Sequence, residues 1–326
     1  MMKTMTTEMD RREFLKAGAA VMALAVGGPA GVQALGANPV GRQFKLNLNV
    51  GNLGVKASQG EALKLAKKHG FEAVTPNPGA LQKCTADELE QLLGEMKAAN
   101  LTWGSAGTGS FFNESESKFA QSQLEIAKLA KTLQAAGVTR CHTWTGSSNS
   151  TLTYRENFKQ HVERTRQIGR ILADCGLRFG IEYIGTKTNS WRGKYPFVRT
   201  AAEMKELAVE TGLANIGLVL DSWHWWQAGD TEADVLKLAD QDIISVDLND
   251  APTEPPREQL PDSPRRLPCA TGVINIQSFL GALIKVGYTG PVQAEPFDKS
   301  LAQMTADEAV GATAAAVKKA VALAGG

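Results

Sequence analysis

The amino-acid sequence predicts an α/β fold, a single-domain (β/α)8 TIM barrel. Eight short apolar segments alternate with longer helical patterns over the chain beyond residue 36. That part of the chain is long enough for a barrel, which typically takes about 250 residues. A doubly wound sheet is the structural rival. Its usual phosphate-binding turn, GxGxxG after a first strand, is matched by neither GSAGTGS nor GTKTNS, so the barrel is favoured.

The predicted strands cover residues 44–48, 73–75, 102–105, 139–144, 178–183, 217–221, 243–248 and 291–295. Three of the intervening helices begin with a Thr-x-x-Glu capping box, in which two side chains satisfy free backbone N–H groups: Thr85/Glu88, Thr200/Glu203 and Thr305/Glu308. Gly70 suits a helix C-terminus. The longest irregular stretch, 249–272, lies between the last two strands and is rich in proline and charge, as active-site loops of barrels are.

The N-terminus has the layout of an export signal. Arg11 and Arg12 precede Phe-Leu-Lys, an apolar run and a stretch of small residues, which is typical of the twin-arginine route, although Asp10 stands where Ser or Thr is commoner. The apolar run is shorter than the about 20 residues that span a bilayer. We therefore expect a signal peptide over residues 1–36, a barrel over 37–326, and a soluble periplasmic or exported protein without stable membrane insertion.

Composition excludes several classes of protein. The 326 residues are 43% hydrophobic and 21% charged, with a formal net charge of +1. Residues 1–36 carry four basic and three acidic side chains, so the remainder is neutral and offers no general attraction for nucleic acid or anionic lipid. The four cysteines are scattered without a CxxC motif, which indicates no particular disulfide framework. The composition does not exclude a homo-oligomer.

Four consecutive predicted strands end on acids. These are Glu182, Asp221, Asp247 and Glu295, and the intervals between them are each compatible with one β/α repeat. In a barrel the carboxyl ends of the strands meet at one mouth, where catalytic groups gather. Carboxylates that converge there repel one another, and a divalent cation with oxygen ligands, such as Mn²⁺ or Mg²⁺, is the simplest compensation. The competing interpretation is that each acid caps a helix or pairs with a distant Arg or Lys.

The motifs GIEY, LVLDSWHWW, VDLNDAP, RRLPCATGVI and GYTGPVQAEPF, in this order, resemble the xylose-isomerase-like TIM-barrel superfamily of sugar phosphate isomerases and epimerases, ketose 3-epimerases and inosose dehydratases. The resemblance runs from about residue 44 to the C-terminus. It implies a metal held by Glu, Asp, His and Glu from four strands, at positions 182, 221, 247 and 295 here. It also implies that Glu182 and Glu295 move protons, so they are our candidate catalytic residues.

Two positions depart from the family pattern. Asp247 stands where many relatives have His. A carboxylate at this position favours Mn²⁺ or Mg²⁺ over Co²⁺ or Zn²⁺. The alternative is that this residue no longer coordinates the metal. Cys269 and Ala270 replace a common Gly-Glu pair, which puts the chemistry of that loop in doubt.

Five side chains are candidates for substrate binding. His224 lies three residues after Asp221, and the resemblance assigns it a substrate oxygen; a metal ligand or a packed core histidine are the alternatives. His142 ends the fourth strand, and Lys187 follows Glu182 by five residues. Arg257, Arg265 and Arg266 lie in the long loop, and one of them could close over substrate; Arg257 is our candidate, and a solvated loop charge is the alternative for each. Trp225 offers a face for a sugar ring, although packing explains it equally well. His69 and His161 lie in helical patterns and are expected at the surface.

A metal bridging adjacent sugar oxygens acidifies the neighbouring C–H, and carboxylates can remove and return the proton. The sequence thus predicts a divalent-metal-dependent sugar isomerase or epimerase, acting on a free or oxidised sugar because sugar phosphates are largely cytoplasmic. A 3-keto-glycoside lyase or hydrolase, or a sugar dehydratase, is the alternative on the same site. A non-catalytic periplasmic sugar-binding protein and an apurinic-site endonuclease are rivals, the latter disfavoured by only four histidines and a neutral charge.

Overall fold

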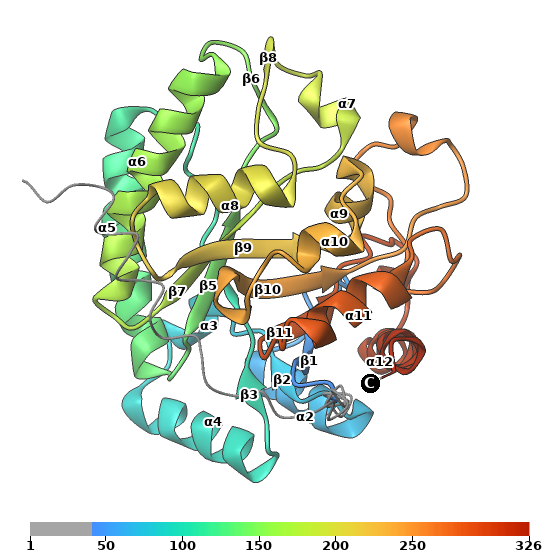
Figure 1. Cartoon of the computed structure of the whole chain (residues 1–326). Coiled ribbons are helices and arrows are strands. Elements are labelled where there is room, and N and C mark those ends of the chain that lie inside the picture. The colour runs from blue at the N-terminus through green and yellow to red at the C-terminus, as the bar shows by residue number, and fades with distance from the viewer. Residues whose placement is uncertain (1–40, 326) are drawn as a thin grey trace, which may run out of the picture. The chain divides into compact units, whose positions relative to one another are not determined.

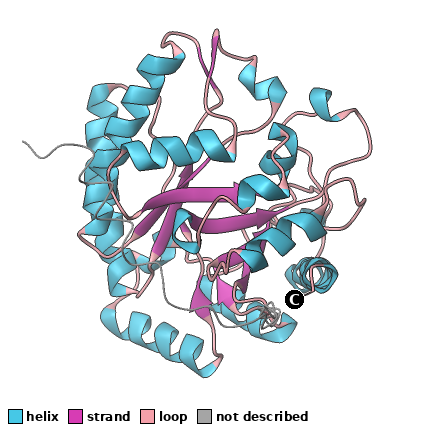
Figure 2. Cartoon of the chain, viewed as in Figure 1, coloured by secondary structure: helices cyan, strands magenta, loops and turns pink. Residues whose placement is uncertain are grey.

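A curled parallel sheet carries the fold (Figures 1 and 2). The computed structural model describes residues 41–325, so the predicted signal peptide lies outside the described residues. The strands of this sheet are β1 (Lys45–Leu48), β2 (Ala73–Val74), β3 (Thr102–Trp103), β4 (Ala106–Gly107), β5 (Arg140–Trp144), β7 (Arg178–Glu182), β9 (Ile216–Asp221), β10 (Ile243–Leu248) and β11 (Pro291–Ala294).

The sheet closes into the predicted barrel. Its strand order is β3-β2-β1-β11-β10-β9-β7-β5-β4, with parallel pairing throughout. The two outermost strands in this order, β3 and β4, are consecutive in the chain and separated only by Gly104 and Ser105. They correspond to the single predicted strand 102–105. Gly104 is required at this break, because a Cβ there would collide with the buried side chain of Asn47.

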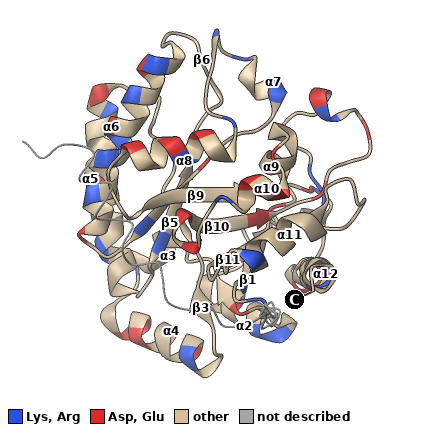
Figure 3. Cartoon of the chain, in the orientation of Figure 1, with Lys and Arg blue, Asp and Glu red and all other residues tan. Residues whose placement is uncertain are grey.

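Helices surround the sheet (Figure 2), and acidic and basic residues are interspersed along them (Figure 3). They are α2 (Gln59–His69), α3 (Pro78–Leu81), α4 (Ala86–Ala98), α5 (Glu116–Ala135), α6 (Tyr154–Ala173), α7 (Lys187–Ser190), α8 (Ala201–Glu210), α9 (Ser222–Ala228), α10 (Glu232–Val235), α11 (Ile276–Lys285) and α12 (Ala306–Leu323), with 3-10 turns η1 (Asp240–Asp242), η2 (Arg257–Gln259) and η3 (Leu301–Gln303). In the described part of the chain, none of these helices is both long and apolar enough to cross a bilayer.

The predicted helix signals are confirmed. Capping boxes open α4, α8 and α12 at Thr85, Thr200 and Thr305, and Gly70 ends α2 in the left-handed conformation with φ 75°. An antiparallel ribbon of β6 (Ser148–Asn149) and β8 (Tyr195–Pro196) was not predicted. It joins two loops at the carboxyl ends of β5 and β7, and its two-residue strands are too short to show periodicity.

The expected surface position of His161 is wrong. This residue is 1% exposed, and its ring stacks on Phe112 with centroids 4.4 Å apart. Nε2 lies 2.7 Å from the Thr145 hydroxyl and Nδ1 lies 2.9 Å from the Asn157 carbonyl, so the neutral imidazole is satisfied at both nitrogens. Burial lowers its pKa to about 4. His69 is half-buried and pairs with Asp307 at 2.9 Å.

Candidate functional site

The strand register brings the four predicted acids together. Asp221 ends β9 and pairs with Asp247 on β10, which in turn pairs with Gln293 on β11; Glu182 ends β7, and Glu295 directly follows β11. Carboxylate oxygens of Glu182, Asp247 and Glu295 lie within 4.8 Å of one another. We call the side chains of Glu182, Asp221, Asp247 and Glu295 the carboxylate cluster.

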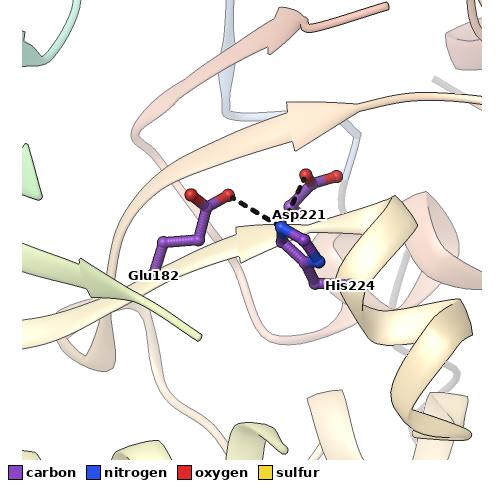
Figure 4. A group of neighbouring side chains, drawn as sticks. All are labelled: Glu182, Asp221 and His224. Atoms are coloured by element: carbon purple, nitrogen blue, oxygen red, sulfur yellow. Dashed lines mark ion pairs between the residues drawn. The ribbon is translucent and has the colours of Figure 1, made fainter. Parts of the chain in front are cut away.

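A second group shares Glu182 with the first. Glu182, Asp221 and His224 offer one ligand atom each within 4.8 Å, and the three side chains point toward one another from β7, β9 and α9 (Figure 4). The Nε2 atom of His224 is 3.9 Å from Glu182 Oε1 and 3.8 Å from Asp221 Oδ2. Asp221 and His224 are fully buried, whereas the Glu182 side chain keeps 16% exposure.

An arginine that the sequence did not single out lies inside the carboxylate cluster. Arg265 Nη1 donates to Asp221 Oδ2 at 2.6 Å and to Glu295 Oε2 at 2.7 Å, and Nη2 donates to Asp262 Oδ1 at 3.0 Å. Its side chain is 2% exposed. Backbone hydrogen bonds of 2.8 Å in both directions between Asp250 and Arg266 hold the loop against the end of β10 and place Arg265 there.

The loop arginine expected near substrate is not the one that reaches the site. Arg257 donates to the Trp226 carbonyl at 3.2 Å, lies over the Trp226 ring and pairs with Glu258 at 3.5 Å. Lys187 is partly exposed, 3.9 Å from Glu258. Trp225 is 5% exposed, packs on Phe279 and donates to the Thr231 carbonyl. None of these three contacts a carboxylate of the cluster among the described residues.

Neighbouring amides and a backbone N–H orient two of the acids. Asp221 Oδ1 accepts from the Asn249 amide at 2.7 Å and from the Trp223 backbone N–H at 2.8 Å, which leaves Oδ2 to face the cluster. Asp247 Oδ1 accepts from the Gln293 amide at 2.7 Å. Asn249 and Gln293 were both missed. Gln293 lies two residues before Glu295 and therefore on the same face of the strand, a signal that the alternation of β-structure contains.

Both ring nitrogens of His224 face N–H donors. The Gly185 backbone N–H lies 3.2 Å from Nδ1 and Arg265 Nη2 lies 3.2 Å from Nε2, and a neutral imidazole has only one acceptor nitrogen for the two. Burial lowers the pKa of this imidazole, with Asp262 opposing the effect. Only glycine fits at position 185, because a Cβ would collide with the His224 carbonyl. His224 therefore lies beside the cluster with Arg265 against its Nε2, and its ligand atom is close enough to those of Glu182 and Asp221 to serve a metal as well as a substrate oxygen.

His142 lies deeper in the barrel than predicted. It pairs with Gly180, two residues before Glu182, and its Nδ1 is 2.8 Å from the Ser105 hydroxyl. Burial lowers its pKa to about 4. The residue level with Glu182 is Trp144, whose indole is 48% exposed at the mouth. Trp144 is thus an accessible aromatic residue that the sequence analysis overlooked in favour of Trp225.

Burial and mutual repulsion favour the protonated forms of the acids. Burial, Glu295 and Asp221 raise the pKa of Glu182 well above its usual range, and burial and Asp247 do the same for the pKa of Glu295. Burial and Asp221 raise the pKa of Asp247 to about 7, opposed by the Gln293 hydrogen bond. Burial opposes the charge of Arg265, but Asp221 and Glu295 outweigh it and raise the pKa of the guanidinium.

The same end of the barrel carries a cavity that no residue of the carboxylate cluster lines. This cavity of about 700 Å³ is lined by residues that follow β1 and β2, including Asn49, Thr75 and Asn77, and by Gly107 of β4. Cavities of this size hold small-molecule ligands. In the long loop, Cys269 has φ 61°, a left-handed conformation that favours glycine. The family resemblance implied glycine here in many relatives, and this is a conformation that glycine adopts without strain.

Comparisons with known proteins agree with the geometry. Inosose isomerase of Halalkalibacterium halodurans is 27% identical over 164 residues, 49% of this chain and 55% of that protein. A 3-dehydroshikimate dehydratase of Pseudomonas aeruginosa is 28% identical over 137 residues, 41% of this chain and 20% of that protein. The chain thus matches about half the length of the inosose isomerase and a smaller share of the dehydratase.

Solved structures extend the likeness over most of the chain. A xylose isomerase domain protein from Alicyclobacillus acidocaldarius has a TM-score of 0.73 and 26% identity, covering 86% of this chain and 98% of its own. The IOLI protein with a bound zinc atom has the same TM-score and coverage with 21% identity. D-psicose 3-epimerase with D-fructose has a TM-score of 0.64 and 18% identity, covering 83% and 95%.

The family model described as xylose isomerase-like TIM barrel matches residues 63–320, a range that contains all four acids, His224 and Arg265. The predicted fold class is confirmed, and so is the family to which the sequence motifs pointed. The chain belongs to the xylose isomerase-like TIM barrel family.

Proposed function

We propose that this protein is a divalent-metal-dependent sugar isomerase or epimerase that removes a proton next to the carbonyl of a free or oxidised sugar. The observation that carries this proposal is the carboxylate cluster, and above all Glu182 Oε1, a buried oxygen without a hydrogen-bond partner at its centre. A buried polar atom of this kind is costly unless something binds it. A divalent cation fits the position.

The residues that would hold the cation are Glu182, Asp221, Asp247 and Glu295. All their donor atoms are oxygens, which suits Mn²⁺ or Mg²⁺ better than Co²⁺ or Zn²⁺. The family includes a zinc-bound structure, which supports a divalent metal without selecting the ion. When bound, the metal would polarise the substrate carbonyl and acidify the adjacent C–H.

The side chains of this protein supply the proton transfers. Glu182 and Glu295 approach from β7 and from the end of β11, with β9 and β10 between them, so they face the cluster from two sides. Burial and the neighbouring acids raise the pKa values of both carboxyl groups, which favours uptake of a proton, one of the two transfers that general acid–base catalysis requires. His224, whose Nε2 faces the cluster, would contact a substrate oxygen, and the cavity at the same end of the barrel would hold the rest of the sugar.

Elimination on the same site is the second candidate. The similarity to a 3-dehydroshikimate dehydratase favours it, because dehydration also begins with loss of a proton next to a carbonyl. A 3-keto-glycoside lyase or hydrolase would use the same first step and expel the aglycone. The reactions differ in where the electron pair goes after deprotonation, and therefore in the product.

We also propose export by the twin-arginine route, which rests on Arg11, Arg12 and the apolar run that follows them. A periplasmic position would favour free or oxidised sugars as substrates. Replacing both arginines by lysine in the full chain should leave the protein in the cytoplasm after cell fractionation. Periplasmic recovery of that variant would contradict the route.

The function is tested by NMR in D₂O with metal-reconstituted protein and a panel of free, keto and glycosidic sugars. We expect Mn²⁺-dependent deuterium uptake at a carbon next to a carbonyl, read after removal of the ion. Epimerised, isomerised or eliminated products distinguish the reactions. Absence of exchange with every sugar, together with tight binding of unaltered sugar, would instead support a binding protein.

A further inference from the structure

Arg265 occupies the ligand atoms that a metal in the cluster would use. Its Nη1 bridges Asp221 Oδ2 and Glu295 Oε2 at 2.6 and 2.7 Å. The other oxygen of Asp221 is already engaged by the Asn249 amide and the Trp223 N–H. Asp221 therefore has one oxygen to offer, and the guanidinium holds it.

One guanidinium does not pair with every acid of the cluster. Five acids lie around it when Asp262 is included, and Arg265 is hydrogen-bonded to three of them, Asp221, Glu295 and Asp262. The buried Glu182 Oε1 remains without a partner even with Arg265 in place. The arrangement therefore satisfies part of the cluster and leaves Glu182 and Asp247 to a proton or to a further cation.

Two residues in contact with Arg265 line a second cavity, toward which its side chain can move. Asp262 lies three residues before it on the same loop, and its side chain is 35% exposed. The guanidinium lies 4.6 Å from the centroid of the Phe297 ring, and both Phe297 and Asp262 line a cavity of about 470 Å³. The arginine can thus release Asp221 and Glu295, keep Asp262 as its partner and move toward this cavity.

We propose that Arg265 is the internal counter-ion of the metal-free protein and that it competes with the divalent metal for Asp221 and Glu295. This inference rests on the proposed metal-dependent function. Metal binding displaces the guanidinium, so the apparent metal affinity is lowered by the fraction of molecules in which Arg265 holds the cluster. The arginine also stabilises the metal-free fold by offsetting the repulsion among the acids.

Calorimetric titration of MnCl₂ into the metal-free full chain tests the competition. Replacing Arg265 by Gln should tighten Mn²⁺ binding by about 5- to 150-fold, the usual range of coupling between two ligands, and should lower the melting temperature of the metal-free protein. Arg266→Gln is the matched control: this neighbour loses the same charge, but its Nη1 contacts the Arg265 carbonyl and lies 3.9 Å from Asp298. Its Mn²⁺ affinity should change by less than about twofold.

Crystals of the wild-type protein with and without Mn²⁺ give a second measurement that needs no variant. We expect Arg265 Nη1 to leave Asp221 and Glu295 when Mn²⁺ binds. Mn²⁺ in the cluster with both ion pairs intact, or equal affinity of the wild type and Arg265→Gln, overturns the competition but leaves the metal-dependent function standing. Absence of Mn²⁺ binding to the wild type and to Arg265→Gln alike overturns both.

Discussion

Two buried arginines in this molecule have opposite surroundings. Arg164 on α6 donates to the carbonyls of Phe111, Phe112 and Glu114, and pairs with the single carboxylate of Glu116. Arg265 at the barrel mouth lies among an excess of carboxylates. The loop around Arg164 supplies hydrogen-bond partners for its guanidinium, which indicates a structural role. In the Arg265 region, the buried Glu182 Oε1 has no hydrogen-bond partner and several acids lie within reach of one another, which indicates a site for a ligand.

The largest expected effect is the loss of activity when an acid beside Arg265 is replaced. Glu182→Gln removes the proposed proton carrier at the mouth, and the rate of metal-dependent deuterium uptake should fall by about 10²- to 10⁴-fold. The melting temperature should not fall, because one of several repelling acids becomes neutral. Glu258→Gln, on the same side of the barrel but exposed in the long loop, is the control and should keep the wild-type rate. An equal loss in both variants would mean that the cluster is not special.

Arg164→Ala should lower the stability of the fold and leave the proposed metal site unaffected. Three buried carbonyls lose their donor, so we expect the free energy of unfolding in urea to fall by about 3 kcal/mol. Mn²⁺ affinity of the folded fraction should stay unchanged. Arg155→Ala, an exposed position on the same helix, should cost less than about 0.5 kcal/mol. Weakened Mn²⁺ binding in Arg164→Ala would erase the distinction between the two regions.

The two regions should also respond to acid with opposite sign. His161, beside Arg164, has a folded pKa of about 4, below its unfolded value, so the unfolded state binds more protons between pH 4 and about 6.5. The stability it supports is present above pH 6.5 and falls by up to about 1.4 kcal/mol per pH unit below it. Glu182 and Glu295, with raised pKa values, stabilise the metal-free fold as pH falls.

Urea titrations of metal-free protein between pH 4 and 7 measure this difference. The curve of His161→Phe should lose part of its acid slope, and the curve of Glu182→Gln should become steeper because the opposing contribution is removed. A His161→Phe slope equal to that of the wild type would contradict the assignment of His161 as a buried neutral ring.

A smaller effect probes the orientation of Asp221. Asn249→Ala removes the amide that holds Asp221 Oδ1, and Mn²⁺ affinity should fall by about 10- to 100-fold, as for other residues that orient metal ligands. Asn275→Ala, which removes the N-cap of α11, should lower stability without changing Mn²⁺ affinity. Unchanged binding in Asn249→Ala would show that the backbone alone positions the aspartate.

The acids could be predicted from the sequence because each follows an apolar run that must be a buried strand. The segment IGLVLD of β9 is buried at every position, so its end is sharply defined by composition. The barrel then places four such ends at one mouth. The signal at β3 and β4 was weaker, since two-residue strands around a glycine carry little periodicity.

Arg265 could not be chosen from the sequence because an irregular loop has no period that says which of its arginines turns inward. His161 did carry a signal that was overlooked. The buried residues of α6 include Asn157, His161, Arg164, Thr165 and Ile168, which recur at helical spacing and form one face. His161 and Arg164 on that face are hydrogen-bonded to Thr145 and to backbone carbonyls, so polarity alone did not mean exposure.

The most direct test of the central claim is the stoichiometry of Mn²⁺ binding to the metal-free protein, measured by calorimetry for the wild type and for Asp247→Asn. We predict one ion per wild-type chain and at least about tenfold weaker binding in the variant, since the site loses a charged ligand while the Gln293 contact is retained. A wild-type protein that binds no Mn²⁺, or an Asp247→Asn variant that binds it as tightly as the wild type does, would contradict the account of four strand-end carboxylates sharing one cation.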